Sequence, residues 1–253
     1  MPPSEPAGYV RVTAGRCSAV TLAAHEEDAR ALLADGTIYE AAARDLAAQP
    51  LEGRGVAFAI ALPVSGARVV VRHNRHGGML ARLTGDRFFP PTRAPYELEM
   101  ALRLRDAGVR TPEVVMYGVD RTRLVFCRAD VATREIWGSR DLSCYLAPEE
   151  AAGSRTAAWE ATRALVRTLD AAGARHHDLN VKNVLLAQGP TGLEAWLLDV
   201  DRVVFEVPYA ASVRVGNAQR LLRSARKWRD TRGGVVDEDE LIALGTRRDP
   251  IQS

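Results

Sequence analysis

Two short segments in the second half of the chain carry side chains suited to phosphoryl transfer. Residues 175–183 read RHHDLNVKN, which places Asp178 and Asn183 on one expected loop, and Asp199 follows the apolar strand expected at 195–198. Phosphoryl transfer needs a carboxylate that orients and deprotonates the attacking hydroxyl, and oxygen ligands that hold magnesium on the phosphates. Asp178 is therefore the expected catalytic base, and Asn183 and Asp199 are the expected magnesium ligands.

The spacing of these residues matches a known catalytic loop. Asp178 and Asn183 are separated as in the kinase sequence H-R-D-L-x-x-x-N, and Asp199 falls where the aspartate of D-F-G falls. His177 replaces the arginine of that loop, and Asp201 replaces the D-F-G glycine, either as a further metal ligand or as a turn cap. Neither change removes a catalytic group. The pattern therefore favours a small, constitutively active relative over a regulated protein kinase.

A glycine turn in the first half could cover the phosphates of a nucleotide. Gly53 and Gly55 come directly before a strand expected at 56–62. Where no side chain intervenes, backbone N–H groups can approach phosphate closely. We expect Gly53 and Gly55 to contact the nucleotide, with an ordinary hairpin turn as the alternative.

An arginine in the first half stands where kinases carry a phosphate-binding lysine. The strand that ends in Arg72 resembles the V-A-I-K strand, and the chain has lysine only at 182 and 227. Arginine can hold phosphate as a bidentate fork. Glu97, early on an expected helix, is the expected partner of Arg72, with Glu99 as the fallback.

Apolar spacing and turn residues predict the elements that must position these groups. We expect helices over 25–48 with a break near Gly36, and over 96–107, 141–146, 155–172 and 217–230. We expect strands over 56–62, 67–72, 121–127, 184–186 and 195–198. The fold class is therefore α+β, with a β-rich first lobe at 1–130 that has one long helix, and a short, mostly helical second lobe at 131–253. Residues 1–50 match no motif and form an unassigned extension of the first lobe.

Composition excludes several classes of protein. No run of about 18 uncharged apolar residues could span a membrane, and the N-terminus lacks a secretory signal, so we expect a cytoplasmic protein. The net charge of +2 does not by itself indicate nucleic acid, and the arginine-rich helix at 217–230 has no interleaved aromatic residues apart from Trp228. The cysteines lie far apart without metal-ligand spacing, at Cys17, Cys127 and Cys144.

Several segments together resemble one family, the lipopolysaccharide kinases, and within it the 3-deoxy-D-manno-octulosonic acid (Kdo) kinases. The similarity runs from about Gly53 to Lys227. The segments that carry it are Gly53-Arg54-Gly55, RHNRHGG at 72–78, 83–88, 97–108, RAD at 128–130, HDLN at 177–180 with Asn183, DVDR at 199–202, and AQRLLRS at 218–224.

The resemblance implies a two-lobed, protein-kinase-like fold with ATP as donor and Mg²⁺ as cofactor. The implied acceptor is a Kdo-bearing lipid A precursor, phosphorylated on a sugar hydroxyl at the cytoplasmic face of the inner membrane. In this resemblance Asp178 becomes the base, Asn183 and Asp199 become the metal ligands, and Arg72 and Glu97 become an ion pair.

Other functions stay open at this stage. A lipopolysaccharide heptose kinase is the nearest rival, because the catalytic loop does not identify the sugar; a kinase acting on a protein or another small molecule comes next. A non-catalytic pseudokinase scaffold is disfavoured, because it would tolerate the loss of Asp178, Asn183 or Asp199. The basic helix at 217–230 predicts a peripheral, salt-sensitive association with the inner membrane through arginines that include Arg220.

Overall fold

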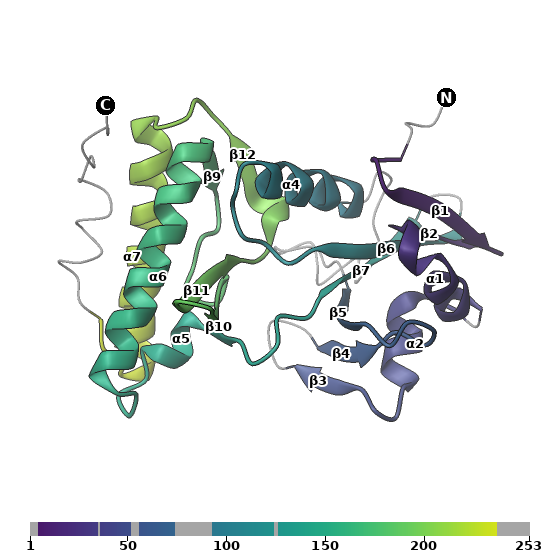
Figure 1. The fold of residues 1–253 in the computed structure, drawn as a ribbon, viewed down its shortest axis with the longest axis horizontal. Helices are drawn as coiled ribbons and strands as arrows, with labels where there is room; N and C mark the ends of the chain where they lie inside the picture. The colour runs from purple at the N-terminus through teal and green to yellow at the C-terminus, as the bar shows by residue number, and fades with distance from the viewer. Residues whose placement is uncertain (1–4, 35, 52–55, 74–92, 124–125, 237–253) are drawn as a thin grey trace. The chain divides into compact units, whose positions relative to one another are not determined.

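The structure is a computed structural model that describes residues 5–34, 36–51, 56–73, 93–123 and 126–236 (Figure 1). The chain forms two compact units: Met1–Glu99 with Glu113–Glu135, and Met100–Pro112 with Ile136–Ser253. The boundary expected at residue 130 falls inside a strand of the first unit, β7 (Phe126–Arg134). Since a strand is held along its whole length by its neighbours, the first unit continues to the end of β7.

The first unit is built on an antiparallel sheet. Within the described residues this sheet has seven strands in the order β1-β2-β6-β7-β5-β4-β3. Every neighbouring pair is antiparallel. The strands are β1 (Tyr9–Ala14), β2 (Cys17–Leu22), β3 (Gln49–Leu51), β4 (Ala57–Ala61), β5 (Arg68–His73), β6 (Val114–Arg123) and β7. The hairpin expected from 56–62 and 67–72 is confirmed as β4 and β5, and its turn uses the positive φ (70°) of Gly66.

The strand expected over 121–127 is wrong. This stretch holds the end of β6 and the start of β7, which pair with each other. No glycine or proline lies between Arg121 and Cys127 to mark a break between two strands. The expectation therefore joined the tips of two strands into one.

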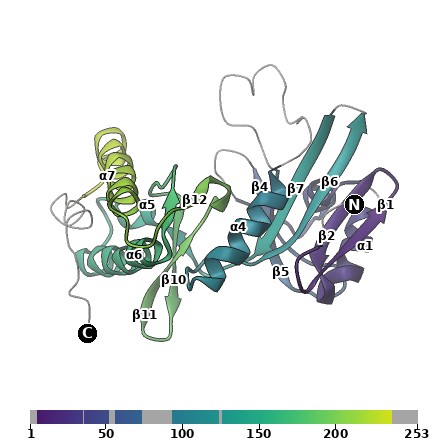
Figure 2. The ribbon, with the colours of Figure 1, turned by 90° about the horizontal axis from the view of Figure 1, so that it is seen from above.

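Two short helices pack on one face of this sheet. They are α1 (Glu26–Leu33) and α2 (Ile38–Arg44), separated at Gly36, whose φ is 146°. Figure 1 labels both, and Figure 2 shows α1 from above. Thr37 and Glu40 form a reciprocal capping box at the N-terminus of α2. Thr37 Oγ1 accepts from the Glu40 N–H at 3.1 Å, and Glu40 Oε2 accepts from the Thr37 N–H at 3.0 Å. Apolar residues of both helices share a buried core with β1, β2, β4, β5, β6 and β7. The break expected near Gly36 is confirmed.

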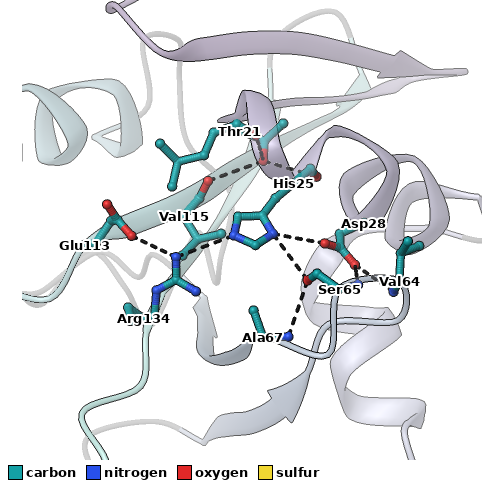
Figure 3. A network of polar contacts seen from close by, with 10 residues as sticks. Thr21, His25, Asp28, Val64, Ser65, Ala67, Glu113, Val115 and Arg134 are labelled. Atoms are coloured by element: carbon teal, nitrogen blue, oxygen red, sulfur yellow. Dashed lines mark hydrogen bonds and ion pairs between the residues drawn. The ribbon is translucent and has the colours of Figure 1, made fainter.

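Residues 1–50 had no assigned role, and their described part belongs to the first unit. Asp28 of α1 accepts hydrogen bonds from the backbone N–H groups of Val64 (2.7 Å) and Ser65 (3.0 Å) in the β4–β5 turn (Figure 3). Burial alone would raise the pKa of Asp28, but hydrogen bonds from Ser65, Val64 and His25 outweigh it and leave that pKa below its ordinary value. Strands β1 and β2 extend the sheet beyond β6. The N-terminal segment is thus part of the lobe rather than an appendage.

The cluster in Figure 3 contains Ser65, His25 and Asp28, a combination found in hydrolases. Here Asp28 Oδ2 (3.0 Å) and Ser65 Oγ (3.3 Å) both approach the same ring nitrogen, Nδ1 of His25. A nucleophile and an orienting carboxylate must bind opposite ring nitrogens for histidine to pass a proton. On the other side, His25 Nε2 lies 3.5 Å from Nη2 of Arg134. The cluster therefore links α1, the β4–β5 turn and β7, and is not a hydrolytic triad.

The second unit is mostly helical. Its long helices α6 (Ala152–Ala172) and α7 (Ala211–Arg232) pack side by side (Figure 1). The expected helices over 155–172 and 217–230 are confirmed and are longer than expected. α6 ends at Gly173, which adopts a left-handed conformation with φ 67°. The remaining elements are α5 (Leu142–Tyr145), β8 (Arg140–Asp141), β9 (Ala174–His176), β10 (Val184–Gly189), β11 (Gly192–Leu197), the short helix η2 (Val200–Arg202) and β12 (Val203–Phe205).

Helix α4 (Ala94–Asp106) confirms the helix expected over 96–107 and continues from the first unit into the second. Gly108, two residues beyond the end of α4, has a φ of 76°. The chain beyond it joins the second unit through β11: the Leu197 N–H donates to the Arg110 carbonyl at 2.8 Å, and Thr111 Oγ1 donates to the Leu197 carbonyl at 2.9 Å.

Candidate active site

The three residues expected to carry phosphoryl transfer lie on two adjacent connections of the second unit. Asp178 and Asn183 lie on the loop between β9 and β10, and Asp199 lies between β11 and η2. The β10–β11 hairpin joins the two connections, and the Leu198 N–H donates to the Asn183 carbonyl at 2.9 Å. The fold therefore places Asp199 beside Asn183, as the expected hairpin requires.

Side-chain amides fix the shape of the loop from 177 to 183. Asn180 Nδ2 (2.9 Å) and Asn183 Nδ2 (3.0 Å) both donate to the backbone carbonyl of Asp178. Asn180 Oδ1 accepts from the Lys182 N–H at 3.0 Å. Because the amino group of Asn183 is used inside the loop, its oxygen Oδ1 is the atom suited to a cation. The donors present, one amide oxygen and carboxylate oxygens, are those that magnesium prefers.

Asp199 has an unusual backbone conformation. Its φ of 55° and ψ of 47° lie in the left-handed region, which few residues other than glycine adopt. Aspartate and asparagine are the side chains that tolerate it best. Asp199 is exposed and precedes the single turn of η2, in which Asp201 lies. Local strain of this kind gathers at functional sites, and here it turns the chain directly at the expected metal ligand.

His176 connects the two catalytic segments from inside the unit. It is fully buried, its Nδ1 accepts from the Asp178 N–H at 3.1 Å, and its Nε2 lies 3.1 Å from the carbonyl of Leu198. These contacts assign Nδ1 as acceptor and Nε2 as donor, which is the neutral ring. Burial lowers the pKa of His176, although the Leu198 carbonyl and Asp199 act in the opposite direction. One imidazole thus holds the backbone ahead of both Asp178 and Asp199.

In the first unit the expected ion pair between Arg72 and Glu97 is confirmed. Arg72 Nη2 lies 2.5 Å from Glu97 Oε1, and their side chains are 28% and 3% exposed, respectively. Val69 and Val71 of β5 face the core shared with α1 and α2, so the alternation of the strand turns Arg72 to the other face, where Glu97 begins α4. A carboxylate in the first turn of a helix is also favoured by the helix dipole. Glu99, the fallback partner, is exposed.

Sequence reasoning missed a polar cluster on the opposite face of β5. His73 Nδ1 lies 2.5 Å from Asp130 Oδ1, and Asp130 Oδ2 accepts from the Tyr39 N–H at 3.0 Å. The Tyr39 ring stacks on His73 with a centroid distance of 3.6 Å and an interplanar angle of 23°. The cluster ties the end of β5 to α2 and β7. His73 and Asp130 stood in segments already noted, but only the β5–β7 pairing shows that they meet.

The remaining expected site residues, Gly53 and Gly55, lie outside the described residues. They belong to the connection between β3 and β4, which pair antiparallel from Leu51 opposite Ala57. Over the part of the chain that the structure describes, no three histidine, cysteine, aspartate or glutamate side chains cluster as a metal site. A magnesium ion held by Asn183, Asp199 and phosphate oxygens needs no such cluster.

The fold is similar to those of solved kinase structures. WaaP in complex with acyl carrier protein matches with a TM-score of 0.50 and 19% identity over 87% of this chain and 86% of that one. The Rio2 kinase–ADP/Mg²⁺–phosphoaspartate complex from Chaetomium thermophilum matches with a TM-score of 0.50 and 13% identity over 95% of this chain and 73% of that one. The expected α+β, protein-kinase-like fold is confirmed.

The sequence is similar to proteins named 3-deoxy-D-manno-octulosonic acid kinase. Identity is 34% with the protein of Stenotrophomonas maltophilia (76% of this chain, 74% of that protein) and 33% with that of Xanthomonas oryzae pv. oryzae (81% of each). With the protein of Actinobacillus succinogenes it is 30%, over 60% of this chain and 64% of that protein. The model of the lipopolysaccharide kinase (Kdo/WaaP) family matches residues 43–239. This chain therefore belongs to the lipopolysaccharide kinase (Kdo/WaaP) family.

Proposed function

We propose that the protein transfers the γ-phosphoryl group of ATP to a hydroxyl of a Kdo sugar on the lipid A inner core. The observation that carries the proposal is the ordered loop from 177 to 183, in which two asparagine amides fix the backbone of Asp178. The hydrogen bond from Leu198 to Asn183 then brings Asp199 alongside. The choice of Kdo as the acceptor sugar rests on the names of the relatives.

Asp178 is the base in this mechanism. Its half-exposed side chain follows a backbone that His176 and Asn183 hold from both sides. A carboxylate fixed in this way accepts the proton of the acceptor hydroxyl as the oxygen attacks phosphorus. Asn183 Oδ1 and the Asp199 carboxylate are the proposed ligands of Mg²⁺, which when bound supplies positive charge to the phosphate oxygens. The β,γ-bond breaks as the new ester bond forms, and ADP leaves.

Arg72 is the proposed phosphate contact of the first unit. Its guanidinium is held by Glu97, and the Arg72 side chain remains 28% exposed, so a phosphate group can reach it. Gly53 and Gly55 are the proposed phosphate-covering residues on the β3–β4 connection. Both assignments follow from ATP being the donor.

The acceptor decides between the Kdo kinase and the heptose kinase readings. The experiment is to incubate the protein with ATP labelled at the γ-phosphate and Mg²⁺, and with three acceptors: Kdo-bearing lipid A precursor, the same lipid without Kdo, and a heptose-extended core. We expect label in the Kdo-bearing precursor and none in the lipid without Kdo. Label that requires heptose would select the heptose kinase instead. Absence of label from every lipid would overturn both.

For a lipid acceptor, we propose that the protein works at the cytoplasmic face of the inner membrane as a peripheral protein. No helix among the described residues is long and apolar enough to cross a bilayer. The exposed side of α7 carries cationic side chains, while Leu221 on its other side is fully buried. The exposed cations are Arg220, Arg223, Arg226, Lys227, Arg229 and Arg232. Each basic residue near an anionic surface contributes about 1 kcal/mol, screened by salt.

Vesicle flotation tests this association. Changing Arg220, Arg223 and Arg226 together to glutamine should weaken binding to anionic vesicles at low salt. The matched control changes three exposed arginines of the first unit to glutamine: Arg11, Arg30 and Arg44. Arg11 and Arg30 form ion pairs with Glu5 and Glu26, and Arg44 donates to the carbonyl of Glu40. Like the α7 variant, this control removes three positive charges, but from another surface. Equal flotation of both triple variants would show that α7 has only a structural role.

A further inference from the structure

The buried side of α7 holds the backbone that leads into the catalytic loop. Asn217 of α7 is fully buried. Its Oδ1 accepts from the His176 N–H at 2.9 Å, and its Nδ2 donates to the Ala174 carbonyl at 2.9 Å. Both contacts are to the backbone of β9, so one side chain binds two of the polar groups on that edge of the strand.

Asn217 binds the edge of β9 along which no strand runs among the described residues. β9 pairs with β12 along its other edge, where the His177 N–H donates to the Arg202 carbonyl at 2.9 Å. In a parallel ladder, a single residue accepts from one N–H and donates to the carbonyl two residues earlier. The side-chain amide of Asn217 makes the same two bonds to His176 and Ala174. β9 is therefore fixed on both edges, although its sheet has two strands within the described residues.

A second residue of α7 holds the loop after the catalytic aspartate. Ser224 Oγ accepts from the Val181 N–H at 3.1 Å. Ser224 lies two helical turns beyond Asn217, so both side chains project from one stripe of α7, with the fully buried Leu221 between them. Asp178 thus lies in a short span of chain that one rigid helix holds on both sides.

We propose that Asn217 is a positioning residue for Asp178, and that Ser224 assists it from the other end of the loop. This inference deepens the proposed kinase activity and rests on it for the assignment of Asp178 as base. Asn217 acts through the β9 backbone and His176, whose ring accepts from the Asp178 N–H. Its loss should move the base relative to the acceptor hydroxyl, and a misplacement near 1 Å lowers turnover by about 10²-fold.

The test compares Asn217→Leu and Asn217→Asp with a buried control. Thr162 in α6 is also fully buried, but Thr162 Oγ1 donates only within its own helix, to the Ala158 carbonyl at 2.7 Å. Thr162→Val therefore removes a buried hydrogen bond of the same unit without removing a hydrogen bond to β9. We expect Asn217→Leu to lower kcat by about 10²-fold while the KM for ATP changes by less than about 3-fold. Asn217→Asp keeps an acceptor for His176 and should lose less.

Hydrogen exchange gives a readout that needs no catalysis. In Asn217→Leu the amide of His176 should exchange at least about tenfold faster, whereas in Thr162→Val it should not. This result holds even if the enzyme proves inactive on every acceptor tested, so it separates failure of this inference from failure of the proposed function. Unchanged exchange at His176, or an unchanged kcat in a folded Asn217→Leu protein, would overturn the inference.

Ser224→Ala decides the matter if Asn217→Leu does not fold. Ser224 is half-buried and holds only the Val181 N–H, so its loss should leave the fold intact. We expect a fall in kcat of about 3- to 10-fold and faster exchange at Val181, without a matching change in the KM for ATP. Wild-type kcat together with wild-type exchange at Val181 would contradict the role of α7.

Discussion

The ion pair between Arg72 and Glu97 yields a prediction whose size follows from burial. Exposed ion pairs contribute about 0.2–1 kcal/mol, whereas removing one partner of a fully buried pair costs about 3–5 kcal/mol. This pair lies between those limits, because the Glu97 side chain is 3% exposed and the Arg72 side chain is 28% exposed. We therefore expect a coupling free energy of about 1–3 kcal/mol between Arg72 and Glu97.

A double-mutant cycle measures this coupling. The free energy of unfolding in urea is determined for the wild type, Arg72→Met, Glu97→Gln and the double variant. Arg72→Met should be the more destabilising single change, because it removes a cation from a buried carboxylate. Glu97→Gln leaves a guanidinium that water can reach. The coupling should largely persist in about 0.5 M salt, since a partly buried pair is weakly screened.

Two results would refute this reasoning. A coupling below about 0.3 kcal/mol would mean that the pair behaves as a surface contact. A larger loss of unfolding free energy from Glu97→Gln than from Arg72→Met would reverse the asymmetry that burial dictates.

For activity, Arg72→Ala should impair phosphate transfer strongly. Arg72→Lys should retain part of it, because lysine binds phosphate as a point charge and lacks the bidentate fork of arginine.

Three further predictions concern the second unit. Burial lowers the pKa of His176, so below about pH 6.5 the unfolded state binds a proton that the folded state does not. The free energy of unfolding should therefore be highest above pH 6.5 and fall by up to about 1.4 kcal/mol per pH unit below it. A His176→Gln protein with the wild-type pH dependence would contradict this. Gly173→Ala should destabilise by at least about 1 kcal/mol more than Gly138→Ala; both glycines have positive φ, but a Cβ at Gly173 would lie 2.3 Å from the Glu206 carbonyl oxygen, and equal melting temperatures would refute the clash. Asp199→Asn should keep the wild-type melting temperature, because asparagine tolerates the left-handed backbone, while losing phosphate transfer; normal transfer would remove Asp199 from the metal site.

Helices with a clear stop were predictable from the sequence. α4 and α6 combine apolar residues at helical spacing with a glycine at the C-terminus, Gly108 and Gly173, and both glycines adopt positive φ. β1 was missed, although Tyr9 and Val12 are buried and Arg11 and Thr13 are exposed. That near-alternation is short, and two strands alone rarely form a stable sheet without a third strand beside them. In the structure, β6 is this third strand and pairs with β2.

Local spacing made part of the site readable. Asp178 and Asn183 lie on one loop, so their relation is fixed by a few residues of sequence. Arg72 and Glu97 are farther apart in the chain, and their pairing was foreseen from a resemblance rather than from local pattern. Asn217 was seen only as the start of a basic helix. Its contact with β9 depends on how α7 packs, which no short segment specifies.

The most direct test of the proposed function is the rate of phosphate transfer by Asp178→Asn. The substitution keeps the size of the side chain and the backbone groups that His176, Asn180 and Asn183 bind, so the loop should keep its shape. With saturating ATP, Mg²⁺ and Kdo-bearing lipid A precursor, we predict that transfer falls by about 10²- to 10⁴-fold while the melting temperature stays that of the wild type. Transfer at the wild-type rate would contradict the assignment of Asp178 as the base.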